Sequence, residues 1–141
     1  MNRKQAVLAV LAASNGAYHS PVQVQKLFFL VDRNIPKNVG GPHFSFQPYN
    51  YGPFDKSVYE TLEVLETDGL VECASVKTWT EYKLTEKGQA EGEKLLSGLP
   101  KDVQKYIRQL SDFVRSLSFT QLVTAIYKAY PDMKTNSVFQ E

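Results

Sequence analysis

Few residues of the 141-residue chain are of types that could carry out chemistry, and they are widely spaced. Cys73 is the single cysteine, so the chain can form no internal disulfide. The chain has two histidines, His19 and His43, so its cysteine and histidine residues together are too few for a Cys/His zinc cluster. Cys73 lies in a strand-like pattern with no base near it in sequence, which favours a buried thiol over a nucleophile. This cysteine usage indicates an intracellular, cytoplasmic protein.

Motifs for nucleotide or carboxylate chemistry are also missing. Gly40-Gly41 is not followed by the Gly-Lys-Ser/Thr of a phosphate-binding loop, and no glycine-rich fingerprint indicates a dinucleotide site. Glu91 and Glu93 are ordinary helix acids without a second catalytic group nearby. No stretch approaches the roughly 18–20 consecutive apolar residues of a membrane span. We therefore expect no catalysis, no metal, no cofactor and no membrane partner.

The charges of the chain are nearly balanced in number but unevenly placed. Sixteen Lys+Arg against 15 Asp+Glu give a net charge of +1, which excludes a chain-wide basic nucleic-acid binder. Residues 55–72 nevertheless hold six acids and one lysine, a net charge of −5. A helix is predicted over residues 55–68, with core-facing Val58, Leu62 and Leu65 and outward-facing Glu60, Glu63 and Glu66. The three glutamates are candidate protein-interaction residues.

An acidic helix is a poor reader of a DNA groove. Duplex DNA carries one negative charge per ~1.7 Å of axis and is held chiefly by Lys and Arg. Three interpretations of this helix remain open: a solvated face, a surface that docks on a basic protein, and base readout.

The segment from 34 to 54 is irregular and rich in aromatic residues. Its seven Pro and Gly residues interrupt any long element, yet it contains five aromatic rings and no acid. A short strand is predicted over residues 43–47, with Phe44 and Phe46 facing inward. The segment either completes the core or forms a surface for a protein partner or a small-molecule ligand, because exposed rings with few charges are typical of interface cores. The candidate interaction residues here are His43, Tyr49 and Tyr51.

The remaining periodicity predicts five further helices and a hairpin. Asn2 and Ser20 begin the first two helices, and strands are expected over residues 70–75 and 78–84. Further helices follow from Thr85 to Gly98, from about Pro100 to Leu117, and from Ser118 to a stop before Pro131. The fold class expected is α+β.

Four phrases give this order of elements a family resemblance. Val58–Leu65 with Gly69–Val71 resembles the third helix and first wing strand of winged-helix regulators, and Tyr82–Gly88 resembles the second wing strand and following turn. More narrowly, Val24–Phe29 and Tyr51–Phe54 are similar to phrases in the Panacea (SocA-like) antitoxin domain and in YwgA-like proteins.

The resemblance implies a winged helix-turn-helix core of three helices plus a two- or three-stranded wing, used in prokaryotes for toxin neutralisation or regulation. Residues 1–98 would form this core, and residues 99–141 a C-terminal helical extension packed on it as one domain. The leading hypothesis is a non-catalytic, antitoxin-like regulatory module that binds another protein, a toxin being one candidate partner.

The alternative hypothesis is a DNA-binding transcription regulator. Lys77 and Lys83 on the predicted wing, with Trp79, could contact a sugar-phosphate backbone. The helix over residues 100–117 has apolar residues at seven-residue spacing, which could pack within the chain or form a homodimer seam. The seam residues are Val103, Tyr106, Leu110, Phe113 and Leu117.

Overall fold

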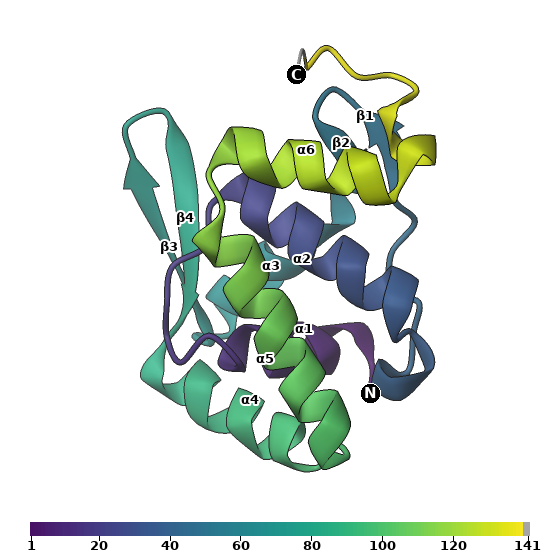
Figure 1. The fold of residues 1–141 in the computed structure, drawn as a ribbon. Helices are drawn as coiled ribbons and strands as arrows, with labels where there is room; N and C mark the ends of the chain where they lie inside the picture. Colours follow the sequence, from purple (N-terminus) through teal and green to yellow (C-terminus); the bar gives the residue numbers. More distant parts are fainter. Residues whose placement is uncertain (140–141) are drawn as a thin grey trace.

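The computed structural model of the chain describes residues 1–139. Within them lie six α-helices, two short 3₁₀ turns and two antiparallel hairpins (Figure 1). In chain order the elements are α1 (Arg3–Ala12), α2 (Pro21–Asn34), η1 (Lys37–Val39), β1 (Gln47–Tyr49), β2 (Gly52–Phe54), α3 (Ser57–Thr67), β3 (Val71–Val76), β4 (Trp79–Leu84), α4 (Glu86–Ser97), α5 (Lys101–Ser116), α6 (Phe119–Ala129) and η2 (Pro131–Lys134). The predicted α+β class is confirmed.

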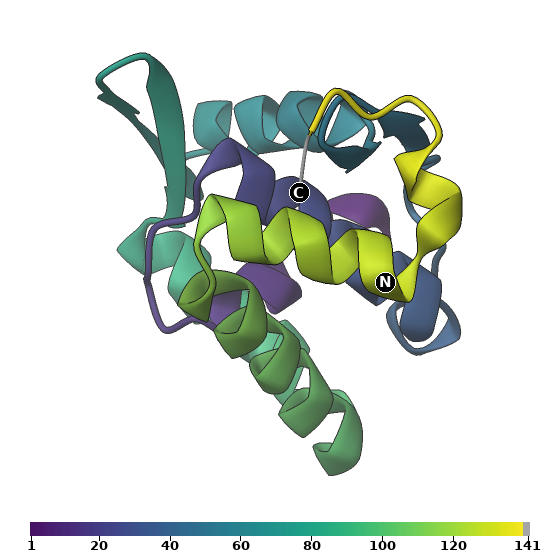
Figure 2. The same ribbon diagram turned by 45° about the horizontal axis from the view of Figure 1, so that its top comes forward.

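The strands form two separate two-stranded sheets, of which the β3–β4 hairpin projects from the helices (Figure 1). In the first, Gln47 of β1 pairs with Phe54 of β2, and in the second, Val71 of β3 pairs with Leu84 of β4. Helix α3 lies between the two hairpins, as Figure 2 shows along its upper edge. This helix therefore lies between the aromatic segment and the projecting hairpin.

Helix α1 is buried on every side, whereas the sequence predicted a single buried face. All residues from Ala6 to Ala12 are at most 4% exposed. The reason is a close approach of α4, where Gly92 lies at the contact: a Cβ on Gly92 would lie 2.5 Å from the Leu8 carbonyl oxygen. Alanine-rich and glycine-rich surfaces let two helix backbones approach this closely.

Helix α2 crosses the centre of the molecule (Figure 1). It begins with the predicted capping box, in which the Ser20 side chain accepts from the Gln23 N–H and the Gln23 side chain accepts from the Ser20 N–H. Every residue from Val24 to Val31 is buried, including the polar residues Gln25 and Lys26. Two polar side chains are therefore held inside the protein by this helix.

The predicted strand over residues 43–47 is wrong. The N–H groups of His43 and Phe44 donate to the Asp32 carboxylate, at 3.0 and 2.8 Å, instead of to a neighbouring strand. The strand begins only at Gln47. Phe44 nevertheless points inward and is buried, and Phe46 is half-buried, so the predicted direction of both rings is confirmed.

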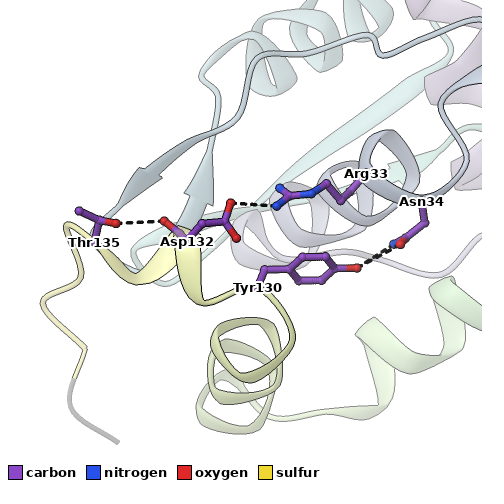
Figure 3. A network of polar contacts seen from close by, with 5 residues as sticks. All are labelled: Arg33, Asn34, Tyr130, Asp132 and Thr135. Carbon is purple, nitrogen blue, oxygen red and sulfur yellow. Dashed lines mark hydrogen bonds and ion pairs between the residues drawn. The ribbon is translucent and has the colours of Figure 1, made fainter.

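The C-terminal segment packs on α2 through a polar network (Figure 3). Arg33 donates to Asp132 at 2.8 Å, and the Asn34 amide and the Tyr130 hydroxyl exchange hydrogen bonds of 2.9 and 3.2 Å. The Arg33 guanidinium also lies 5.1 Å from the centre of the Tyr130 ring. Helix α5 packs mainly on α2, and η2 contacts β1 and β2.

In the part of the chain described, no helix combines the length and apolar character needed to cross a membrane.

Candidate functional site

A pocket of about 230 Å³ opens between α2, the β1–β2 hairpin, α3 and the start of α6. We call it the Lys26 pocket. Its lining consists of Pro21, Val22, Gln25, Lys26, Tyr49, Asn50, Tyr51, Gly52, Phe54, Tyr59 and Phe119. Five of these residues are aromatic, and Lys26 is the one member with an ionisable group of basic character.

Aromatic rings form the rim of the pocket and continue beyond it. Tyr49 and Tyr51 are 52% and 45% exposed, and Tyr51 lies edge-on to Phe119 at 5.2 Å between ring centres. A second series of rings, which we call the aromatic ladder, consists of Tyr49, Phe54, Tyr59 and Tyr82. Successive ring centres in the ladder are 5.0, 5.9 and 6.1 Å apart. The ladder connects the β1–β2 hairpin to β4 across α3.

Lys26 is the most unusual residue of the pocket. It is 3% exposed, and its Nζ donates to the Pro53 carbonyl oxygen at 3.2 Å. Burial lowers the pKa of the Lys26 ammonium from its ordinary 10.5 to about 7. Gly52 stands against it: a Cβ at Gly52, whose φ is +103°, would lie 3.6 Å from Nζ. The amine is therefore close to its point of half-protonation at neutral pH.

Hydrogen bonds between α2 and the start of α3 shape the pocket wall. The Gln25 amide donates to the Asp55 carbonyl oxygen at 2.9 Å and accepts from the Asp55 N–H at 3.0 Å. The Asp55 carboxylate accepts from the Ser45 and Ser57 N–H groups at 2.7 and 2.8 Å. Burial raises the pKa of the Asp55 carboxyl. The hydrogen bonds to its charged form lower the pKa by more than burial raises it, so the pKa lies below its ordinary value. An ionised carboxylate therefore anchors the turn into α3.

The three candidate glutamates lie together on α3. Glu60, Glu63 and Glu66 are exposed, and none of them forms an ion pair within residues 1–139. We call them the acidic face.

Burial and the nearby Glu66 and Glu63 raise the pKa of the Cys73 thiol to about 11, so Cys73 is protonated and a weak nucleophile at neutral pH.

The candidates of the aromatic segment separate into two places. Tyr49 and Tyr51 line the Lys26 pocket, whereas His43 lies at the other end of the segment. The His43 ring nitrogen Nε2 is 2.7 Å from the Val39 carbonyl oxygen, and the Arg3 guanidinium donates to the His43 carbonyl oxygen. His43 thus ties a loop to α1 and takes no part in the pocket.

The nucleic-acid candidates lie on the β3–β4 hairpin. Lys77 is exposed at its tip, and Trp79 is 42% exposed. The Lys83 Nζ lies 4.9 Å from the centre of the Tyr18 ring, and the Tyr18 hydroxyl donates to Glu72 at 2.8 Å. Glu72 is also the strand partner of Lys83. Lys83, the hairpin lysine nearer the body of the protein, therefore has the Glu72 carboxylate on the neighbouring strand.

The residues of the candidate dimer seam face several directions. Val103 and Leu110 are buried within the chain, Tyr106 and Leu117 are half-buried, and Phe113 is 42% exposed. Helix α5, which carries these residues, packs on α2, α1 and α4 through its most buried residues, Ile107 and Val114 among them.

Lys26 was not predicted as a site residue from the sequence. A signal was present, because Lys26 lies between Val24 and Leu27 in a helix whose apolar stripe is widened by Phe29 and Leu30. A lysine in such a helix has no clear path to solvent.

Among residues 1–139, no three His, Cys, Asp or Glu side chains are placed to hold a metal ion.

Comparison with protein-family models, with curated proteins and with solved structures finds no match to this chain. The function must therefore be argued from the geometry of the pocket and the surfaces beside it.

Proposed function

We propose that this protein is a non-catalytic regulatory module, antitoxin-like in the sense of the family it resembles, that acts in the cytoplasm by binding another protein. The observation that carries the proposal is the aromatic ladder. Its rings run from the exposed Tyr49 of the β1–β2 hairpin through Phe54 and Tyr59 to the buried Tyr82, which lies near Glu63 and Glu66 of the acidic face. We infer that the exposed tyrosines and the acidic face, linked by these rings, act together as one binding face.

The composition of this face suits a protein interface. Interface cores are enriched in Tyr, Trp and Phe and poor in charge, and truncation of such anchors often weakens binding by 2 kcal/mol or more. Tyr49 and Tyr51, each about half exposed, have the area and position of such anchors. They would supply most of the affinity.

The acidic face would supply orientation and partner choice. Exposed ion pairs contribute about 0–1 kcal/mol each, so Glu60, Glu63 and Glu66 would add little affinity singly. Complementary charge instead speeds encounter and excludes like-charged partners. We therefore propose a partner that presents Lys or Arg beside an apolar segment.

A winged-helix core remains part of the proposal, since α1, α2, α3 and the β3–β4 hairpin follow the expected order. DNA binding is less well supported. Glutamates occupy the helix that would enter the groove, and Glu72 and Glu81 lie on the same face of the hairpin as Lys83. Phosphate contacts require net positive charge at these places.

The test is affinity capture of the tagged chain from its host, with and without nuclease, using three variants. The first reverses the acidic face with Glu60→Lys, Glu63→Lys and Glu66→Lys, and the second is Tyr49→Ser. A matched control reverses three acids of α4 with Glu86→Lys, Glu91→Lys and Glu93→Lys. We expect one nuclease-resistant protein that the wild type and the α4 control retain and the first two variants lose. Equal retention by all folded variants, or recovery of nucleic acid in place of protein, would contradict the proposal.

A further inference from the structure

We propose that the Lys26 pocket binds a small carboxylic acid with a single aromatic or similarly compact apolar body. The carboxylate would accept hydrogen bonds from the Lys26 ammonium, and the body would pack among the rings of the rim. This inference does not depend on the proposed protein partner, because the pocket can be titrated with a free acid.

The first reason is that Lys26 lacks a counter-charge. An ammonium group has three N–H donors, and the hydrogen bond found for Lys26 within residues 1–139 goes to the Pro53 carbonyl oxygen. The pocket lining contains no aspartate or glutamate. Buried charges in proteins are normally paired, because an unpaired charge loses its hydration without compensation. A ligand carboxylate would supply the missing partner.

The second reason is the size and character of the cavity. About 230 Å³ is below the roughly 300–1,000 Å³ of pockets that hold drug-sized ligands, and so it suits a body of about one ring. The rings of Tyr49, Tyr51 and Phe119 offer edge and face contacts to an aromatic ligand.

The same lining favours a monoanion over a phosphate. A single carboxylate neutralises a single lysine, whereas a phosphate dianion would bring a second charge into an apolar pocket without a cation to match it. The chemistry of the site therefore selects one negative charge on a compact apolar body.

The pocket is also held in shape before any ligand enters. Both polar atoms of the Gln25 amide are bonded to the Asp55 backbone, and Gly52 holds the backbone beside Lys26 at a φ of +103°, a conformation that residues with a side chain rarely adopt. A preformed site does not have to spend binding energy on ordering its walls.

Binding should depend on pH with a defined sign. A carboxylate binds the protonated amine, and burial lowers the pKa of free Lys26 to about 7. The protonated fraction then falls roughly 25-fold between about pH 6.5 and pH 8.5, and the affinity should fall by a similar factor. An acid bound elsewhere on the surface would show no such dependence.

The experiment is a titration of the ¹⁵N-labelled protein with phenylacetate, followed by amide shifts and calorimetry. Phenylacetamide, which has the same shape without the charge, and acetate, which lacks the ring, are the matched probes. We expect phenylacetate to shift amides of β1, β2 and the start of α2, and to bind at least tenfold more tightly than either probe. Lys26→Met should abolish binding, and the exposed Lys56→Met should leave it unchanged.

Phe119→Ala, an exposed rim residue, provides a second variant that does not alter the buried lysine, and we expect several-fold weaker binding. The proposal is overturned if folded Lys26→Met binds phenylacetate as the wild type does, or if phenylacetamide binds equally well. Absence of binding by phenylacetate at millimolar concentration would also overturn it. Binding of a peptide ending in phenylalanine, without binding of free phenylacetate, would overturn the small-acid assignment and favour a protein terminus as the source of the carboxylate.

Discussion

Replacing Lys26 with methionine should raise the stability of the protein and remove part of its pH dependence. Lys26 is 3% exposed and its pKa is lowered from 10.5 to about 7. At pH 7 the amine is therefore fully protonated in the unfolded chain but protonated in only about half of the folded molecules. This difference destabilises the folded state by about 4 kcal/mol at pH 7. Methionine keeps most of the buried length but leaves the Pro53 carbonyl oxygen without its donor, a loss of about 1–3 kcal/mol. The net expected gain for Lys26→Met is about 1–3 kcal/mol.

The sign of the pH dependence follows from the lowered pKa. Above pH 7 the folded protein binds fewer protons at Lys26 than the unfolded chain, so the wild-type free energy of unfolding rises with pH up to about pH 10.5. Between about pH 7 and pH 9 the wild type should gain about 2 kcal/mol relative to Lys26→Met, because other titrating groups cancel in the comparison.

Urea unfolding followed by circular dichroism at pH 7, 8 and 9 measures this difference directly. The exposed Lys56→Met is the control and should follow the wild type in parallel. If wild type and Lys26→Met also run parallel, Lys26 keeps an ordinary pKa in the folded state, and the reasoning about an uncompensated buried ammonium is refuted.

Three further variants test other parts of the structure. Gly88→Ala would place a Cβ 1.9 Å from the Leu70 carbonyl oxygen and should destabilise the protein by more than about 2 kcal/mol, whereas Gly98→Ala, with its nearest contact at 3.4 Å, should change the urea midpoint little. His19 is fully buried, and burial followed by the charge of Arg115 lowers its pKa to about 4, so the folded state resists protonation. The wild type should therefore lose about 2 kcal/mol between pH 7 and pH 5, and an unchanged loss in His19→Leu would show that another group is responsible. Asp32→Ala removes the acceptor of two backbone N–H groups in the aromatic segment, and thermal melts should show a loss of about 2–3 kcal/mol, with a near-neutral result arguing that water replaces the carboxylate.

Local chemistry made much of the fold predictable. Capping boxes at Ser20 and Ser118, and the caps at Asn2 and Thr85, place helix starts within a residue of those observed, because each cap satisfies N–H groups only a few residues away. The hairpin over residues 71–84 was predicted for the same reason, since alternation and a short turn are local properties. The strand over residues 43–47 failed because Asp32, eleven residues earlier, captures the N–H groups that a strand would use.

The candidate site was only partly predictable. Composition alone indicated that Tyr49 and Tyr51 could form a surface, and both line the pocket. Nothing in the spacing showed that Phe54, Tyr59 and Tyr82 would pack in series with Tyr49, because the ladder takes its rings from four elements.

By itself, the sequence determined the α+β class, the helix starts and the concentration of six acids between residues 55 and 72. Each of these depends on residue types and on interactions over a few positions. Only the tertiary structure decided that Lys26 is enclosed without a carboxylate partner in the pocket, and that Tyr49 and Tyr51 of the aromatic segment line one pocket with Tyr59 of α3. The physical reason is that burial and pairing are properties of a neighbourhood: solvent is excluded from Lys26 by elements more than twenty residues away, and a pattern along the chain does not record their approach.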